Sequence, residues 1–73
     1  MEGCKVQWIS ILRYKRDTTL KYQNEAGFCK DLTIKFDDKV LIVSYLNLNP
    51  FKNKRVVRVF NMNMVVDFEY GEM

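Results

Sequence analysis

Hydrophobic and polar residues alternate along much of this chain, so that each segment has one apolar side. In the segment 31–36, the apolar residues that share one face are Leu32, Ile34 and Phe36. The segment 64–70 repeats the pattern, with an apolar face formed by Met64, Val66, Phe68 and Tyr70. Such alternation is typical of a strand with one side on the core and the other in solvent. No segment carries the i, i+3, i+4, i+7 stripe of an amphipathic helix, so the pattern predicts a strand-rich fold.

Three further segments are apolar enough to form strands. The segment 5–14 has one side formed by Val6, Trp8, Leu12 and Tyr14 and the other by Ile9 and Ile11. On this pattern we expect Trp8, like Phe36, to point into the core. The segments 40–48 and 55–60 are apolar on both sides, apart from Arg58 in the second. That composition predicts strands covered on both faces.

Turn-forming residues separate these segments. Arg-Asp at 16–17 ends the first strand, and the segments 24–27 and 37–39 hold the Asn, Gly and Asp residues that turns need. Asn-Pro opens what we expect to be the one longer loop, residues 49–54, because proline disfavours helical geometry at the preceding residue. The segment 61–63, Asn-Met-Asn, predicts a tight turn, since Asn tolerates the left-handed conformation.

We therefore expect six strands, near residues 5–15, 18–23, 28–36, 40–48, 55–60 and 64–70. Short connections make consecutive strands antiparallel neighbours, so residues 31–48 and 54–70 should each form a hairpin. The expected fold class is all-β, a single small antiparallel barrel or sandwich of about five to six strands spanning residues 1–73. One helical turn is the alternative within residues 17–30.

The composition excludes most catalytic chemistry. The chain has no histidine and no glycine-rich loop, so an imidazole base and a phosphate-cradling loop are both absent. The carboxylates Asp37 and Asp38 fit a plain turn, and Asp67 and Glu69 fit a solvated strand face. We therefore expect no enzymatic activity, no cofactor and no metal.

The two cysteines, Cys4 and Cys29, are too few for a zinc site without histidine. They are expected to be free thiols, although the sequence leaves a disulfide open. No run approaches the ~20 apolar residues that span a membrane, and the N-terminus begins with charges in place of an apolar signal core. These features predict a cytoplasmic protein with no membrane partner.

Basic residues dominate the charge, because 12 Lys and Arg stand against 9 Asp and Glu to give a net charge of +3. Seven of the basic residues form two clusters beside aromatic residues, and the candidate partner-binding residues are Arg13, Lys15, Arg16, Phe51, Lys52, Lys54, Arg55 and Arg58. Basic residues among aromatics can bind single-stranded nucleic acid. The alternatives are that they keep a small sheet soluble, or that Arg55 or Arg58 pairs with Asp67 or Glu69 across the last hairpin.

The stretches "FDDKVLIVSY" and "KRVVRVFNMNMVVDFEY" resemble the ending of short β-rich proteins encoded by phages and mobile elements of Gram-positive bacteria. The matching residues are Asp37, Asp38, Val40, Leu41, Phe60, Asn61, Met62, Asn63, Val65, Val66, Phe68 and Glu69. The resemblance covers residues 36–70 and its motifs are structural, so it transfers no functional residue. It implies a small accessory or inhibitory protein that binds host machinery, including antagonists of host defence.

Three functions from different classes follow. The first is a non-enzymatic protein that binds and inhibits a host protein, such as a nuclease or a defence effector. The second is a small barrel that binds single-stranded DNA or RNA. The third is a module that pairs two copies of the chain through a sheet edge. The sequence leaves the partner and the oligomeric state open.

Overall fold

The computed structural model describes residues 3–15, 19–49 and 52–72 of the 73-residue chain. Its strands are β1 (Cys4–Arg13), β2 (Thr19–Gln23), β3 (Cys29–Asp37), β4 (Val40–Asn49), β5 (Lys52–Asn61) and β6 (Val65–Glu72). A short 3₁₀ turn, η1 (Met62–Met64), joins β5 to β6. All strand pairings are antiparallel within one six-stranded sheet. The expected all-β fold class is confirmed, and its form is a curled half-barrel.

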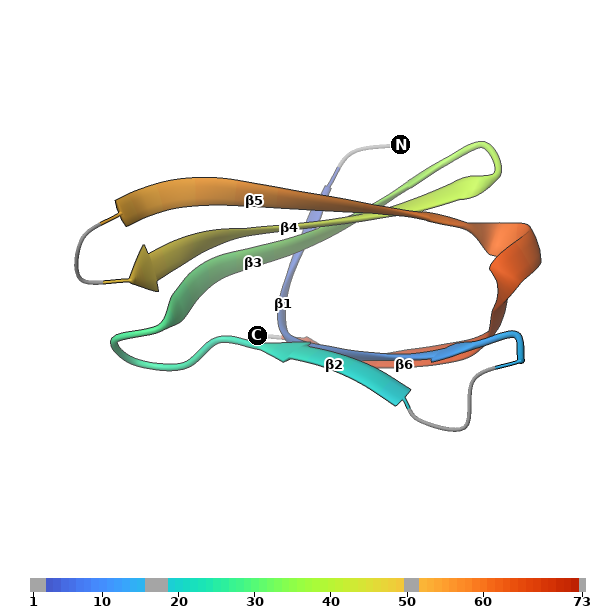
Figure 1. Cartoon of the computed structure of the whole chain (residues 1–73), viewed down its shortest axis with the longest axis horizontal. Helices are drawn as coiled ribbons and strands as arrows, with labels where there is room; N and C mark the ends of the chain where they lie inside the picture. The colour runs from blue at the N-terminus through green and yellow to red at the C-terminus, as the bar shows by residue number, and fades with distance from the viewer. Residues whose placement is uncertain (1–2, 16–18, 50–51, 73) are drawn as a thin grey trace.

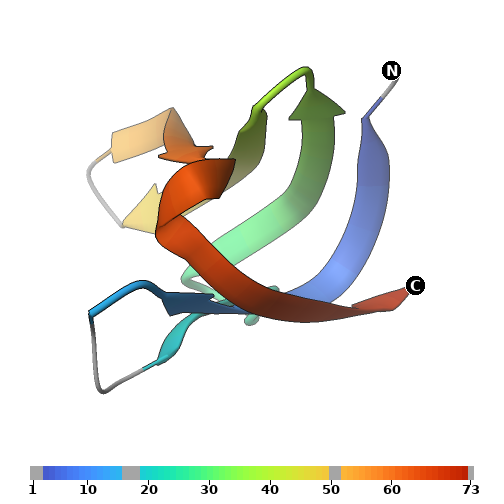
Figure 2. The same cartoon turned by 90° about the vertical axis from the view of Figure 1, so that its right-hand side faces the viewer.

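Strand β1 belongs to both layers of this half-barrel. Its first residues, Cys4 and Lys5, pair with β3, while residues 8–12 pair with β2. The opposite edge of β1 pairs with β6 from Val6 to Arg13. Figure 1 shows β1 passing from the layer of β3, β4 and β5 to the layer of β2 and β6, and Figure 2 shows the resulting curl. One bent strand therefore connects the two layers, which we call the upper layer (β3, β4 and β5) and the lower layer (β2 and β6) after their places in Figure 1.

Strands β3, β4 and β5 form consecutive hairpins. The β3–β4 turn has Asp38 at φ 56°, a left-handed conformation that Asp adopts more readily than most residues, and the expected hairpin over 31–48 is confirmed. Strands β4 and β5 pair from Val40–Asn61 to Asn49–Lys52. The longer loop expected at 49–54 is therefore wrong, because the ladder of backbone hydrogen bonds continues to Asn49 and resumes at Lys52.

The hairpin expected over 54–70 is also wrong. Strand β5 pairs with β4, and β6 pairs with β1 on the other layer. The η1 turn makes this crossing, and the Asn61 side chain caps it by accepting a hydrogen bond from the Asn63 amide at 2.9 Å. Asn61 has φ −72°, so the tight left-handed turn predicted for 61–63 does not form.

Seven fully or almost fully buried side chains form the core between the layers, and they are Val6, Ile9, Ile11, Leu32, Ile34, Leu41 and Val43. Each such side chain contributes roughly 1.5–3 kcal/mol through removal of apolar surface from water. Half-buried aromatic residues close the sides of this core. Phe36 packs against Phe68 with ring centroids 5.2 Å apart, so the expectation that Phe36 points inward is confirmed.

Two β-bulges change which residues face the core. Val6 pairs with Glu72 and Trp8 with Gly71, so Gln7 is an extra residue in β1. Because of this bulge, Val6 and Ile9 are both buried although they are three positions apart. A second bulge, at Val66 in β6, leaves that side chain 60% exposed. The faces predicted for the starts of both strands are therefore wrong.

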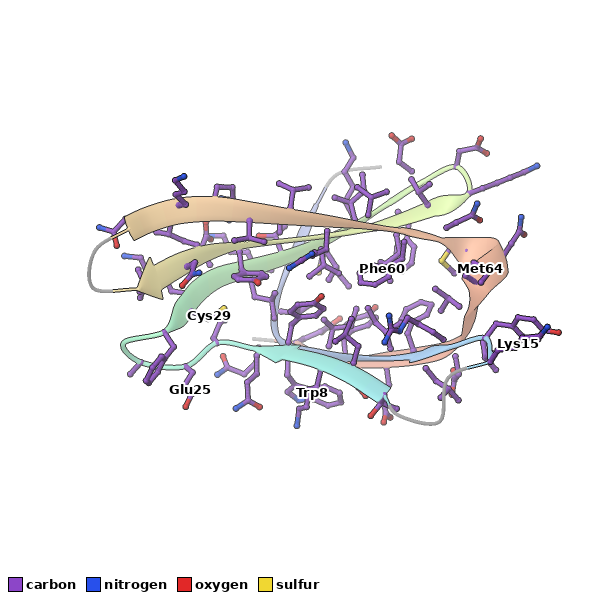
Figure 3. All side chains as sticks on the ribbon, in the orientation of Figure 1. Trp8, Lys15, Glu25, Cys29, Phe60 and Met64 are labelled. Atoms are coloured by element: carbon purple, nitrogen blue, oxygen red, sulfur yellow. The ribbon has the colours of Figure 1, made fainter. Side chains whose placement is uncertain are left out.

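Trp8 lies on the outer side of the lower layer, contrary to the expectation that it points inward (Figure 3). Its indole covers Gly71 on β6, where a Cβ atom would come 2.2 Å from the indole nitrogen. The Lys21 amine lies 5.5 Å from the centroid of the indole on the β2 side. Trp8 therefore joins the three strands of this layer from outside.

Residues 19–30 hold no helix. After β2, the Phe28 and Cys29 amides both donate to the Glu25 carbonyl, at 3.0 and 2.9 Å, and so form a single turn. Gly27 in this turn has φ 85°, which prevents its continuation as a helix. Residues 17–18 of the expected alternative lie outside the described residues.

We predict that Gly71→Ala destabilises the protein by about 1–3 kcal/mol, the usual cost of overpacking, because the new methyl group displaces the Trp8 indole. Urea unfolding followed by circular dichroism measures the loss. The control is the same change in a Trp8→Leu background, where the clash is removed. An equal loss in both backgrounds would show that the indole is not the cause.

Candidate functional site

The structure places the predicted basic residues on two strands. Lys54, Arg55 and Arg58 lie on β5 and are exposed, and Arg13 ends β1. Lys15 follows β1 at φ 61°, with its amine 5.5 Å from the centroid of the Tyr14 ring. Two further candidates, Arg16 and Phe51, lie outside the described residues, as does the side chain of Lys52.

Arg55 is engaged within the chain. Its Nη2 donates to the Asp31 carboxylate, and its Nη1 donates to the Asp31 carbonyl and the Ser44 hydroxyl at 3.2 and 3.3 Å. Asp31 sits in an irregularity of β3 at φ 58°. The pairing of Arg55 or Arg58 with Asp67 or Glu69 is therefore wrong, because β6 lies in the other layer. Arg55 instead fixes the β3 bulge against the outer side of β4.

The ion pair changes the titration of Asp31. The hydrogen bond from Arg55 is the largest cause that lowers the pKa of this carboxyl group below its ordinary value. The Lys5 amine, 3.6 Å from Asp31 Oδ1, acts in the same direction. Asp31 thus forms ion pairs with one side chain of β1, Lys5, and one of β5, Arg55.

An apolar surface covers the outward side of β4 and β5. We define the outer β4–β5 face as Ile42, Leu46, Val57 and Val59. Val57 and Val59 are 55% and 62% exposed, and they lie opposite Ser44 and Ile42 in the ladder. Ile42 and Leu46 are half-buried. The prediction that both strands are covered on both sides is wrong, since nothing in the described chain packs over this face.

Tyr22 on β2 packs against the core among other aromatic residues. The Tyr22 ring contacts Tyr45 and Phe60, with centroids 5.6 and 6.5 Å apart. Burial is the largest cause that raises the pKa of the Tyr22 hydroxyl, and the charges of Arg58 and Arg13 oppose it. One arginine from each cluster therefore acts on the same phenol, although they are distant in sequence.

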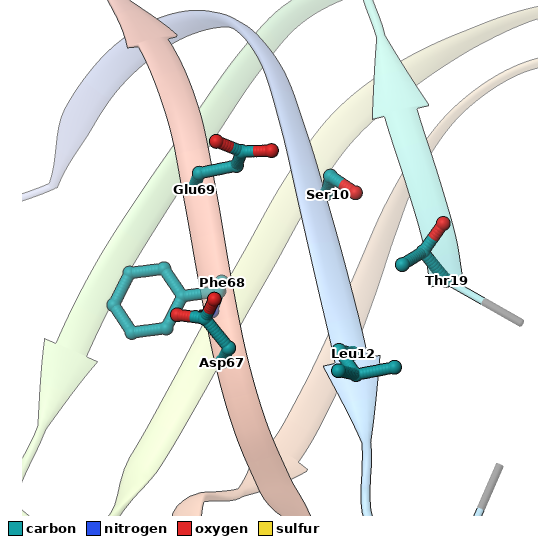
Figure 4. A pocket seen from close by; sticks show the side chains of 6 residues that line it. All are labelled: Ser10, Leu12, Thr19, Asp67, Phe68 and Glu69. Atoms are coloured by element: carbon teal, nitrogen blue, oxygen red, sulfur yellow. Dashed lines mark hydrogen bonds between the residues drawn. The ribbon is translucent and has the colours of Figure 1, made fainter. Parts of the chain in front are cut away.

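A shallow hollow lies on the outer side of the layer formed by β2 and β6 (Figure 4). It is lined by Ser10, Leu12, Thr19, Asp67, Phe68 and Glu69. Asp67 accepts a hydrogen bond from the Phe68 amide at 2.9 Å, so its carboxylate is partly used by its own strand. The hollow has the exposed acids expected of a solvated strand face.

Cys4 and Cys29 are both free thiols, as expected, and the Cys4 thiol donates a hydrogen bond to the Lys5 carbonyl at 3.7 Å. Burial raises the pKa of the Cys29 thiol, and the nearby Glu25 carboxylate adds to the effect. Over residues 3–15, 19–49 and 52–72, no group of three Cys, Asp or Glu side chains is placed to hold a metal ion.

The fold and these surfaces define a small curled antiparallel sheet with an exposed apolar face on one edge strand and basic residues around it. No family model, curated protein or solved structure matches the chain. No helix in the described part of the chain is long and apolar enough to cross a membrane.

Sequence reasoning missed the exposed valines and the outward Trp8. Alternation along β5 separates residues 55, 57 and 59 from residues 54, 56, 58 and 60, but it does not say which set faces the core. The sequence predicted that both sets are covered, with Arg58 as the one interruption, whereas in the structure only the set containing Arg58 faces the core and Val57 and Val59 are exposed. The position of β5 at the end of the sheet, which period-two patterning does not encode, decides this.

We predict that Asp31→Asn lowers the free energy of unfolding at neutral pH but changes it little at pH 2. A carboxyl group with a lowered native pKa contributes stability above its unfolded pKa, about 3.9, and loses it as the pH falls through the native value. Urea unfolding between pH 7 and pH 2 measures this difference. Asp38→Asn, at another left-handed position, controls for the backbone. Parallel pH profiles for wild type and Asp31→Asn would contradict the prediction.

Proposed function

We propose that this protein is a non-enzymatic binding protein that attaches to an acidic partner protein through the outer β4–β5 face. The observation that carries the proposal is the exposure of Val57 and Val59 on an edge strand. Exposed apolar side chains at the centre of a polar rim are the usual composition of a protein interface. The face is also rigid, because it stands on a ten-residue β4–β5 ladder.

The charge around this face favours an acidic partner. On the outer side of the sheet, Arg55 lies two residues from Val57 on β5, and Lys30 and Lys35 of β3 pair with Leu46 and Ile42 of the face. Complementary charge raises association rates and excludes basic competitors. Arg55 is held by Asp31, which fixes its position at the rim before binding. A fixed side chain loses less conformational entropy on association than a mobile one.

The resemblance of residues 36–70 to accessory proteins of phages and mobile elements supports a host protein as this partner. A nuclease or a defence effector that the protein inhibits by occlusion fits the small rigid surface, and it would place the protein in the cytoplasm. Nucleic-acid binding is less favoured on this face, because the apolar side chains at its centre are valine, leucine and isoleucine, and bases stack on aromatic rings.

The test compares the pair of exposed valines on the outer β4–β5 face with one exposed valine on another strand. Wild type, Val57→Asp/Val59→Asp and Val66→Asp are immobilised and exposed to bacterial lysate with and without nuclease treatment, and the captured protein is then purified for titration calorimetry. We predict that the double variant weakens this binding at least about 100-fold, since central interface residues each contribute ~2 kcal/mol or more. Val66→Asp should change it little, because Val66 is equally exposed but lies on β6.

Equal affinity of the double variant and wild type for the purified partner would overturn the proposal. Capture that disappears after nuclease treatment would replace it with nucleic-acid binding, and concentration-dependent self-association lost in the double variant would replace it with a dimer interface. Circular dichroism of all variants confirms that the sheet is retained.

A further inference from the structure

Arg58 lies at an inward position of β5. In the ladder it is opposite Val43, which is fully buried, and its neighbours on the same side are the half-buried Val56 and Phe60. Phe60 points into the space between the layers (Figure 3). Arg58 itself remains exposed because β5 is an edge strand. Its guanidinium group is therefore placed at the open side of the half-barrel.

Arg13 approaches the same region from the other layer. It follows Ile9 and Ile11 at the inward positions of β1, and both isoleucines are fully buried. The Nε atom of Arg13 is buried and has no hydrogen-bond partner. Buried polar atoms almost always have a partner, so an unpaired guanidinium nitrogen points to a group that binds there.

Within the described part of the chain, no carboxylate forms an ion pair with either arginine. The ion pairs among the described residues all belong to Asp31, which binds Lys5 and Arg55. The Tyr22 ring packs against Phe60, the next inward residue after Arg58 on β5, and the charges of Arg58 and Arg13 both act on the Tyr22 hydroxyl group. The fold thus gathers two unpaired cations and a phenol on an aromatic base.

We propose that Arg13, Tyr22 and Arg58 form a binding site for a phosphate group. Guanidinium groups match the oxygens of a phosphate with paired hydrogen bonds, and a phenol can donate a further one. A phosphate carries close to two negative charges at neutral pH, which balances the two arginines. The surrounding aromatic rings lower the local dielectric constant and strengthen these interactions.

The protonation of Tyr22 agrees with this role. Burial raises the pKa of its hydroxyl above the ordinary value, so the group is protonated at neutral pH and can donate to an anion. The site is independent of the proposed partner surface, because Arg58 and Val57 are adjacent in β5 and therefore point to opposite sides of the sheet.

Thermal unfolding in sodium phosphate and in sodium chloride, at equal ionic strength and pH 7, tests the site. We expect phosphate to raise the Tm above its value in chloride, with a rise that grows with the logarithm of phosphate concentration. Arg58→Gln should abolish this difference, and Tyr22→Phe should reduce it. Lys54→Gln is the matched control, since Lys54 is exposed on the same strand and the same side as Arg58.

Arg13→Gln should also abolish the response. Because the Nε atom of Arg13 is buried, this change also alters packing, so the variant of the exposed Arg58, Arg58→Gln, is the decisive one. Equal Tm values in phosphate and chloride, or an equal loss of the response in Lys54→Gln and Arg58→Gln, would overturn the site. Titration with thymidine 5′-monophosphate identifies the source of the phosphate. Tighter binding than inorganic phosphate indicates a nucleotide, equal binding indicates the free ion, and both support the site.

A retained phosphate response in Val57→Asp/Val59→Asp separates this inference from the proposed function. That variant removes the apolar face and leaves Arg13, Tyr22 and Arg58 unchanged. Loss of partner binding with an intact phosphate response supports both proposals. Loss of the phosphate response in this variant would place the anion on the outer face and overturn the inferred site.

Discussion

The fold depends on the ability of β1 to pair with three strands. A single straight strand has two edges and serves one sheet, whereas β1 pairs with β3 at its start and with β2 and β6 further along. The bulge at Gln7 lies where β1 leaves one layer for the other, and a bulge increases local bend and twist. The curl, the core between the layers and the separation of β5 from β6 all follow from this bend.

The bend also determines where the surfaces lie. Because β1 is shared between the layers, β4 and β5 continue the upper layer, and no described strand covers their outer side. Val57 and Val59 therefore stay exposed. The bend also brings Tyr22 of β2 against Phe60 of β5, whose inward side carries Arg58. A flat sheet would have kept these groups apart.

The ion pair of Asp31 supports this arrangement from outside. It joins Lys5 of β1 and Arg55 of β5 to the irregular part of β3, so three strands of the upper layer share one carboxylate. The charges are exposed, and such pairs contribute modestly to stability. Their larger role is to hold Arg55 at the rim of the outer β4–β5 face in one geometry.

The sequence by itself determined the strand-rich class, the β3–β4 hairpin and the inward side of β3, because Leu32, Ile34 and Phe36 alternate over an uninterrupted strand. Alternation is a local signal, and one extra residue reverses it. The bulges at Gln7 and Val66 therefore changed the faces of Trp8 and Val66. Tertiary structure alone decided that β5 and β6 separate, that Arg55 binds Asp31 and that Arg13 and Arg58 stand at inward positions of different layers. These contacts depend on which strand edges pair, and edge pairing is set by the packing of the whole core.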